Sequence, residues 1–216
     1  PVVAIYSTFL QRGYDQFIHD VCLENIDVTF AIDRAGIVGE DGPTHTGSFD
    51  ISFMRCIPNI VISCPSNEHE LWHLLNICYE HKGPAAIRYP RGSGIGVKPI
   101  PNEIEGFEIG KAKKIKDGQS VCILNFGVLM DQIDQIAEKK NYTLYDMRFI
   151  KPIDEDALEH AMQHETIITL EDNTLLGGCG SAIGEKLHKQ KFKGNLLSIG
   201  LKAVSYTHLT LPTRST

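Results

Sequence analysis

The sequence lacks long apolar runs, closely spaced cysteines and an excess of positive charge, and each absence excludes a class of protein. No stretch approaches the roughly 18 unbroken apolar residues that a membrane span requires. The formal net charge of -6 argues against nucleic acid as the main partner, because that binding normally needs a clustered basic face. We therefore expect neither a membrane nor a nucleic-acid partner. What remains is ordinary globular composition, 42% hydrophobic and 22% charged, and 216 residues suffice for one large or two small domains.

The six cysteines show neither the spacing of a metal site nor that of a disulfide framework. Four of them lie in apolar runs, as buried free thiols do in proteins of a reducing cytosol. We therefore expect free thiols and a cytoplasmic location. The chain starts at Pro1, without Met and inside an apparent strand, so we expect a fragment of a longer protein. The cysteines are Cys22, Cys56, Cys64, Cys78, Cys122 and Cys179.

Short apolar runs alternate with amphipathic stretches, which is the rhythm of parallel βαβ units. From Pro90 to Pro101 the sequence collects three prolines and three glycines with little periodicity, as domain boundaries do. We therefore expect an α/β protein with two consecutive parallel-sheet domains, at residues 1–92 and 107–201, joined by a linker at 93–106. In the first domain, strands are expected at 1–6, 28–32, 60–64 and 85–89, and helices at 8–25, 48–56 and 67–81.

The second domain is expected to open with a hairpin around Asp117 and Gly118. Its further strands are predicted at 121–125, 143–147, 166–171 and 196–199, with helices at 130–139, 154–163 and 181–190. Lysines before the turn alternate with apolar residues, which favours the solvated face of an edge strand over a nucleic-acid surface. These are Lys111, Lys113, Lys114 and Lys116.

Residues 33–47 form the stretch richest in functional side chains, and they directly follow the apolar run 28–32. They include five charged groups or His, four Gly and a Pro, and unpaired charges are costly to bury. The segment is therefore expected to be an exposed loop shaped for a small polar ligand. A plain strand-to-helix connection is the alternative, but most such connections have only about 2 to 6 residues.

Phe9 does not fit the helix in which it is expected. Leu10, Tyr14 and Phe17 share one apolar stripe, whereas Phe9 points about 100° away from Leu10. It stands just past a strand end, where open α/β sheets bind ligands, and could stack on a heterocycle. Packing against a neighbouring helix explains the pattern equally well.

Three arginines follow the second and fourth predicted strands, so they are expected at the same edge of a parallel sheet. Converging guanidinium groups suit a phosphate or carboxylate, which they hold with paired hydrogen bonds. The arginines are Arg34, Arg88 and Arg91. The alternative is ion pairing with Asp33, Asp41 or Asp50.

Three other patterns have structural explanations that require no ligand. His69 and His73 match a zinc-protease spacing, but they lie opposite the apolar stripe of their helix, so solvent exposure is expected rather than zinc binding. His160 and His164 are likewise expected at the surface. Residues 177–184 resemble a dinucleotide fingerprint with the wrong glycine spacing, which favours close packing of a helix on a sheet. Anion binding at that helix N-terminus remains open.

Four strings carry a family resemblance: residues 1–16, 33–45, 88–92 and 146–152. In this order and at these separations they resemble the 1-deoxy-D-xylulose-5-phosphate synthases, which belong with the transketolases. The resemblance runs from Pro1 to about Leu201. It implies that residues 1 to about 92 are a transketolase-like pyrimidine-binding domain and that the transketolase C-terminal domain follows. Residues 202–216 match nothing in the pattern and are expected to be an aberrant, non-native tail.

The resemblance implies an activity for the complete protein. The family condenses pyruvate with glyceraldehyde 3-phosphate, releasing carbon dioxide, with thiamine diphosphate and Mg²⁺. The product feeds non-mevalonate isoprenoid, thiamine and pyridoxal phosphate synthesis, and the complete enzyme would be a homodimer in the bacterial cytoplasm. The family's catalytic glutamate and its diphosphate- and Mg²⁺-binding domain lie upstream of Pro1. The chain alone is therefore expected to be inactive, and it contains no expected metal ligand.

The resemblance also assigns residues to a site. Phe9 matches the aromatic residue that stacks on the aminopyrimidine of the cofactor. Asp41 and His45 match the polar pair beside the reacting carbons, as proton carriers or orienting groups. Three residues match the groups that hold the acceptor phosphate, namely Tyr6, Arg34 and Arg91. All six are expected at one rim of a parallel sheet.

Two other functions stay open at this point. A β subunit of a 2-oxo acid dehydrogenase shares the two-domain layout and would act on a lipoyl carrier, but it has less reason to place phosphate-binding arginines here. A shortened transketolase-like chain could also be a non-catalytic module for interaction or regulation.

Overall fold

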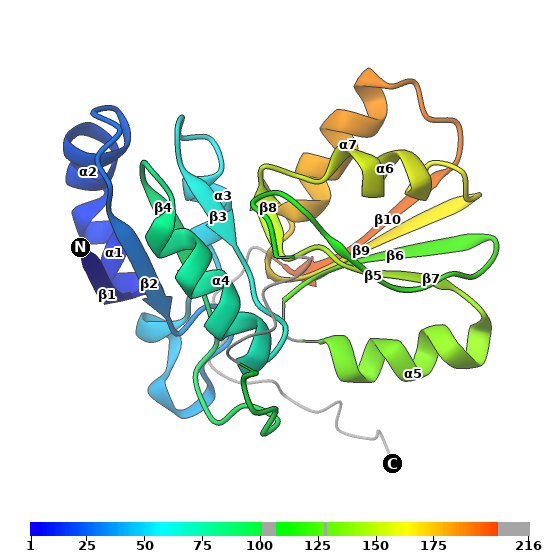
Figure 1. Ribbon diagram of the computed structural model, residues 1–216, viewed down its shortest axis with the longest axis horizontal. Coiled ribbons are helices and arrows are strands. Elements are labelled where there is room, and N and C mark those ends of the chain that lie inside the picture. Colours follow the sequence, from blue (N-terminus) through cyan, green and yellow to red (C-terminus); the bar gives the residue numbers. More distant parts are fainter. Residues whose placement is uncertain (101–106, 128, 203–216) are drawn as a thin grey trace, which may run out of the picture.

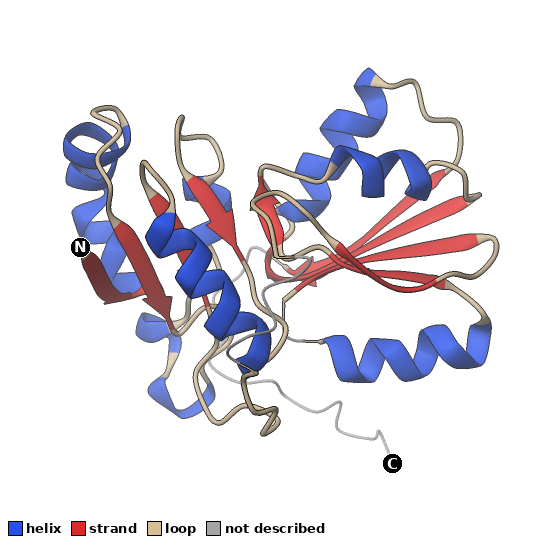
Figure 2. Ribbon diagram, viewed as in Figure 1, coloured by secondary structure: helices blue, strands red, loops and turns tan. Residues whose placement is uncertain are grey.

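The computed structural model describes residues 1–100, 107–127 and 129–202, which form two α/β domains (Figure 1). Each domain is built on a five-stranded sheet. Helices cover both faces of each sheet, as Figure 2 shows. The predicted class, two consecutive α/β domains with largely parallel sheets, is confirmed.

The first sheet has the order β1-β2-β4-β3-β8, and its first four strands are parallel. Both faces of the interior strand β2 are buried, which explains its largely apolar sequence. Phe30 and Ile32 pack with the core on one face, and Ala31 packs on the other. The strands are β1 (Val2–Tyr6), β2 (Thr29–Asp33), β3 (Val61–Ser63), β4 (Ala85–Arg88) and β8 (Phe149–Lys151).

The helices of the first domain lie on opposite faces of this sheet. On one face the chain from Ser7 to Cys22 is irregular: α1 (Ser7–Leu10) and α2 (Tyr14–Gln16) are separated by a 3-10 turn and followed by a π-helical turn. α3 (Asp50–Met54) packs on the same face. The other face is covered by α4 (Glu68–Glu80), whose first turn is capped by Asn67 accepting a hydrogen bond from the Glu70 amide at 3.0 Å.

The second sheet has the order β10-β9-β6-β7-β5. α5 packs on one face, and α6 and α7 pack on the other (Figure 1). The strands are β5 (Lys113–Lys116), β6 (Val121–Phe126), β7 (Thr143–Asp146), β9 (Thr166–Thr174) and β10 (Asn195–Leu201). The helices are α5 (Met130–Lys140), α6 (Glu155–Ala161) and α7 (Cys179–Lys189).

The predicted hairpin around Asp117 and Gly118 is wrong. β5 does not pair with β6 across this turn; it pairs antiparallel with β7, with Lys113 opposite Asp146. The physical reason is that both edges of β6 are already occupied by the parallel partners β7 and β9. β5 is still an edge strand, so the prediction is confirmed for Lys113, Lys114 and Lys116, while Lys111 precedes the strand.

β8 was not predicted at all. This three-residue strand follows β7 in the chain, yet it adds antiparallel to β3 and completes the sheet of the first domain. A strand that follows the second domain's β7 in the chain therefore belongs to the sheet of the first domain. The predicted domain limits remain predictions, because the linker at 93–106 is described only to residue 100 and the expected tail lies outside the described residues beyond Lys202.

The predicted exposure of His73 is also wrong. Its side chain is only 4% exposed, its Nε2 lies 3.0 Å from the Ile100 carbonyl, and its ring stacks on Phe107 with centroids 4.4 Å apart. Ile100 and Phe107 thus pack over the face of α4 that the periodicity assigned to solvent. His160 and His164 are half-buried rather than exposed, since they contact Tyr145 and Thr143.

Five of the six cysteines are buried and all six are free, as expected, with Cys56 exposed. Gly180 in α7 allows close packing on the sheet, because a Cβ built there would stand 2.5 Å from Ser198 Oγ. Across the described ranges there is no cluster of three side chains able to hold a metal ion. The helices within those ranges are also too short or too polar to cross a membrane.

Candidate active site

The carboxyl ends of β1 and β2 bring the predicted site residues together. The two strands pair in parallel with Tyr6 opposite Asp33, so the residues that follow each strand emerge at the same edge. Arg34 comes directly after β2, and Phe9 lies in α1 directly after β1. The loop at residues 33–47 lies beyond these strand ends (Figure 1).

Three rings form the first part of the site. Tyr6 and Phe9 stack with centroids 5.0 Å apart, and the His45 ring lies edge-on to Phe9 at 5.5 Å. Phe9 keeps 42% of its surface exposed although two other rings flank it. Its ring borders a hollow of about 320 Å³, to which Arg12, Thr44 and other residues of α1 and the loop contribute. The hollow offers a planar ligand an aromatic surface.

Two arginines and a carboxylate form the second part. Arg34 Nε donates a hydrogen bond to Asp41 Oδ2 at 2.8 Å, and Arg91 Nε lies 3.0 Å from the same oxygen. The Arg34 guanidinium also pairs with Asp33 at 2.7 Å and lies over the Tyr6 ring, 3.9 Å from its centroid. Arg34 therefore links the carboxylates to the aromatic cluster.

The electrostatics follow from this pairing. The hydrogen bond from Arg34, with the nearby charge of Arg91, lowers the pKa of Asp41 below its usual value. The same hydrogen bond to Asp41 raises the pKa of Arg34. Asp41 is thus ionised at neutral pH, and one of its oxygens is shared by two guanidinium groups.

The loop is held in shape at its base. Gly36 and Gly47 exchange two backbone hydrogen bonds, of 2.8 and 2.9 Å, which close the loop across its two ends. Arg34 has a φ of 58°, in the left-handed region that side chains other than glycine seldom adopt. Further out, Thr8 Oγ1 donates to the Thr44 carbonyl at 3.0 Å and ties the loop to α1.

Arg88 does not join the other two arginines, so its predicted role as an anion ligand is wrong. It is 3% exposed and lies inside the protein, where its Nε donates to Asp50 Oδ2 at 3.0 Å and its Nη1 donates to Asp172 Oδ1. Ion pairing, the alternative that the sequence left open, holds for Arg88 with Asp50, and Arg34 and Arg91 also form ion pairs, with Asp33 and Asp41. The six residues expected at one rim are all there: Tyr6, Phe9, Arg34, Asp41, His45 and Arg91.

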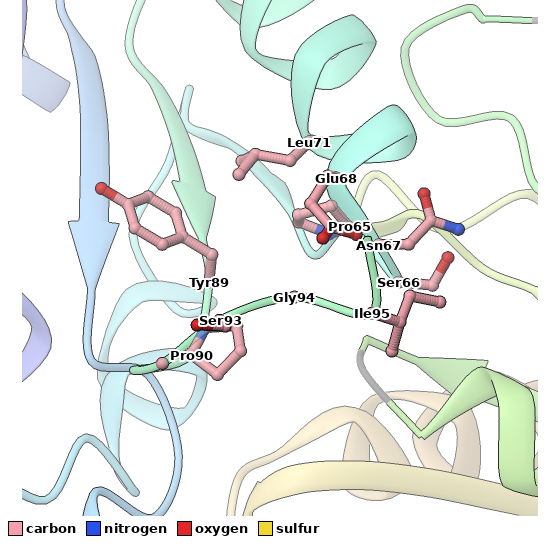
Figure 3. A pocket seen from close by; sticks show the side chains of 11 residues that line it. Pro65, Ser66, Asn67, Glu68, Leu71, Tyr89, Pro90, Ser93, Gly94 and Ile95 are labelled. Atoms are coloured by element: carbon pink, nitrogen blue, oxygen red, sulfur yellow. The ribbon is translucent and has the colours of Figure 1, made fainter. Parts of the chain in front are cut away.

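A second cavity, of about 230 Å³, lies between the start of α4 and the segment that follows β4, and it was not predicted from the sequence. Figure 3 shows Tyr89 and Leu71 beside it, with the segment from Pro90 to Ile95 passing along it. Glu68 accepts a hydrogen bond from the Gly96 amide at 2.7 Å, which lowers the pKa of Glu68 and holds this segment against α4. The signal available in the sequence was only the helix start after Asn67.

Asp172 is the other residue that sequence reasoning missed. It follows the apolar part of β9 and reaches Arg88 in the first domain. Three consecutive polar residues, Glu171 to Asn173, interrupt an apolar strand there, and this was the available signal. Glu171 itself accepts hydrogen bonds from the Cys179 and Gly180 amides, both at 2.8 Å, so the N-terminus of α7 is occupied by a carboxylate of the same domain.

Comparison with known proteins agrees with this architecture. The model of the transketolase pyrimidine-binding domain matches residues 1–95, and that of the transketolase C-terminal domain matches residues 110–213. A solved structure described as a split-gene transketolase, inactive beta4 tetramer, superposes with a TM-score of 0.80 at 24% identity, covering 94% of this chain and 67% of that one. Transketolase from Campylobacter jejuni superposes with a TM-score of 0.67 at 19% identity, covering 95% and 32% of the two chains. The chain belongs to the transketolase family.

Two sequence relatives within that family share one name. The chain is 53% identical to the 1-deoxy-D-xylulose-5-phosphate synthase of Idiomarina loihiensis over 202 residues, which is 93% of this chain and 32% of that protein. It is 52% identical to the synthase of the same name from Francisella philomiragia over 213 residues, 97% of this chain and 34% of that protein. The chain thus spans about a third of the length of these relatives and is similar to 1-deoxy-D-xylulose-5-phosphate synthases over that third.

Proposed function

We propose that this chain is part of a thiamine-diphosphate-dependent synthase that condenses pyruvate with glyceraldehyde 3-phosphate to 1-deoxy-D-xylulose 5-phosphate, with loss of carbon dioxide. The observation that carries the proposal is the convergence of Arg34 and Arg91 on one oxygen of Asp41, at 2.8 and 3.0 Å, beside an exposed aromatic ring. The site therefore combines a place for a phosphate with a place for a planar ring. The names of the sequence relatives agree with this reaction.

The aromatic part of the site fits half of the cofactor. Phe9 is exposed beside the hollow, and a flat aromatic surface suits an aminopyrimidine ring. When bound, the cofactor would supply the electron sink for decarboxylation. The described residues include no group of three metal-binding side chains, so we assign Mg²⁺ and the diphosphate to a part of the enzyme outside them. We accordingly propose that these residues alone are inactive.

The arginines are suited to the phosphate of the acceptor. Nε of each contacts Asp41, which leaves the terminal nitrogens of Arg91 and part of the Arg34 fork for a second anion. A planar guanidinium holds phosphate through paired, charge-assisted hydrogen bonds. The Tyr6 ring, which the Arg34 guanidinium stacks on, restrains the position of that guanidinium. The acceptor would thus be anchored by its phosphate and its carbonyl directed towards His45 and Phe9.

Asp41 and His45 would act next to the reacting carbons. Asp41 is held ionised by the arginines, so in this arrangement it accepts hydrogen bonds and orients groups. The His45 ring stands beside Phe9 and its Nδ1 lies 3.1 Å from Thr44 Oγ1, which restrains the ring orientation. We propose His45 as the group that hands protons to or from the substrates.

The complete enzyme would work in the bacterial cytoplasm as a homodimer. Its product would enter isoprenoid, thiamine and pyridoxal phosphate synthesis. A β subunit of a 2-oxo acid dehydrogenase remains the main competing function, but its lipoyl substrate gives no role to two arginines converging at the rim. Binding of an isolated lipoyl domain to the chain would favour that alternative.

Replacing Arg34 with alanine in the complete enzyme tests the proposal. Hydrogen bonds to charged groups contribute about 1.5 to 3 kcal/mol each, so the KM for glyceraldehyde 3-phosphate is expected to rise about 10- to 100-fold. The KM for pyruvate should stay near its original value. Arg55→Ala is the matched control, because Arg55 pairs with Glu185 at 2.6 Å, away from the site. An unchanged acceptor KM in Arg34→Ala would refute the phosphate assignment.

A further inference from the structure

Asp172 lies in the second domain, but its carboxylate contacts the first. Arg88 Nη1 donates a hydrogen bond to Asp172 Oδ1, while Arg88 Nε donates to Asp50 Oδ2 at 3.0 Å. Arg88 and Asp50 are buried, and 17% of the Asp172 side chain is exposed. Nη2 of Arg88 has no hydrogen-bond partner within the described residues, so these two carboxylates hold the guanidinium. Asp172 therefore supplies one of its two anchors.

The other oxygen of Asp172 packs against the base of the loop at residues 33–47. A Cβ built on Gly36 would stand 2.6 Å from Asp172 Oδ2 and 3.2 Å from the Asp172 carbonyl oxygen. Gly36 also has a φ of +76°, so neither its space nor its backbone suits a side chain. The carboxylate thus touches the glycine that closes the loop through its two hydrogen bonds with Gly47.

The base of the loop sets the direction of Arg34. Arg34 is two residues before Gly36 and has an unfavourable positive φ, and such backbone strain persists only where the surroundings hold it in place. The Arg34 carbonyl faces Gly47, where an added Cβ would lie only 2.1 Å away. Displacement of Gly36 therefore moves both Gly47 and Arg34, and with them the guanidinium that contacts Asp41.

We propose that Asp172 is a positioning residue for the acceptor site: it bridges Arg88 and Gly36, and so holds the loop that carries Arg34, Asp41 and His45 in its binding shape. The inference rests on the proposed function for the identity of the acceptor. Among the described residues, no hydrogen bond or ion pair is found between Asp172 and Arg34, Asp41 or Arg91, so its effect is indirect. The second domain thereby contributes to acceptor binding without touching the acceptor.

The test compares three variants of the complete enzyme. Asp172→Ala removes both the anchor of Arg88 and the support of Gly36. Asp172→Asn keeps the volume and a hydrogen-bond acceptor, and is the conservative variant. Ser52→Ala is the matched control, because Ser52 Oγ donates to the Leu176 carbonyl at 2.7 Å and accepts from Asn173 at 2.9 Å between the same two domains, without touching the loop.

Two readouts are needed. Hydrogen exchange of the peptide covering residues 33–47 measures how well the loop is held in place. The acceptor KM, compared with kcat, measures the effect on acceptor binding. We expect faster loop exchange and an acceptor KM raised roughly 5- to 20-fold in Asp172→Ala, with pyruvate KM and kcat changed less than twofold. Asp172→Asn should recover most of both effects, and Ser52→Ala should show neither.

The outcomes separate this inference from the proposed function. Loop exchange and acceptor KM at wild-type values in Asp172→Ala, in an enzyme that makes the product, would overturn the role of Asp172 and leave the function standing. Equal effects in Asp172→Ala and Ser52→Ala would also overturn it, because they would show general loosening between the domains. If the wild-type enzyme makes no product, the proposed function fails, while loop exchange still decides on Asp172. If Asp172→Ala does not fold, Asp172→Ser, which also removes the carboxylate, is measured against Ser52→Ala, and loop exchange no faster than in Ser52→Ala would overturn the inference.

Discussion

Replacing Asp146 with asparagine is expected to remove a pH-dependent loss of stability. Asp146 ends β7 and is 2% exposed, and it accepts a hydrogen bond from Ser66 Oγ at 2.5 Å. Burial and, second to it, the negative charge of Glu70 together raise the pKa of Asp146 to about 7, against the opposing effects of Ser66 and Arg148. The group therefore titrates near neutral pH in the folded protein and near 3.8, the ordinary value, when unfolded.

The sign follows from proton binding. Between pH 3.8 and about 7 the folded state keeps the Asp146 proton while the unfolded state loses it. Each rise in pH stabilises the unfolded state, which has released this proton, relative to the folded state. The free energy of unfolding therefore falls by about 1.4 kcal/mol per pH unit over this range. The contribution of Asp146 is fully present below the unfolded pKa and is lost as the pH passes the folded pKa. Between pH 5 and pH 8 this loss amounts to about 3 kcal/mol.

Urea unfolding of the wild type and of Asp146→Asn at pH 5 and pH 8 measures the effect. Asparagine has no charge to bury and can keep the contact with Ser66, so its stability relative to wild type should improve by about 3 kcal/mol between the two pH values. Asp134→Asn, at an exposed position of α5, is the control and should show little change. A difference between Asp146→Asn and wild type that stays constant from pH 5 to pH 8 would refute the reasoning.

Two further predictions concern packing and thiol reactivity. Gly180→Ala should lower the free energy of unfolding by about 1 to 3 kcal/mol in thermal or urea unfolding, because the new methyl group would meet Ser198 Oγ at 2.5 Å. Gly13→Ala, where a Cβ meets nothing within 4 Å, should cost far less, and equal losses would contradict the packing argument. Cys56 is the exposed thiol among six, while burial raises the pKa of Cys64 and Cys179 well above the usual value, so a thiol reagent should label Cys56 alone in the native protein. Rapid labelling that persists in Cys56→Ser would count against the buried placement of the other thiols.

The strands and helices with strong periodicity were predictable from the sequence. β2, with its apolar run, and α4, with Asn67 before its first turn, lie within a residue or two of their predicted limits. Local pattern determines such elements. β8 has three residues and exists through its pairing with β3, which is far away in the chain, so no local pattern could reveal it.

The errors at single residues have the same origin. His73 was assigned to the solvent from its position on α4, but the Phe107 ring packs over that face. Helical periodicity tells which face a residue is on and does not tell what covers that face. Asp172 was overlooked for a related reason, since its importance lies in its contact with Arg88, which is 84 residues earlier in the chain and in the other domain.

The two arginines at the end of the first sheet show what sequence spacing leaves undecided. Arg88 and Arg91 are three residues apart, and both were expected at an anion site. Arg88 is the last residue of β4, where two carboxylates, one from each domain, neutralise it. Arg91 follows Pro90, keeps 38% of its side chain exposed and contacts only one oxygen of Asp41 among the described salt bridges. The number of donors that the fold already uses decides which arginine can bind a ligand, and that number depends on partners from distant parts of the chain.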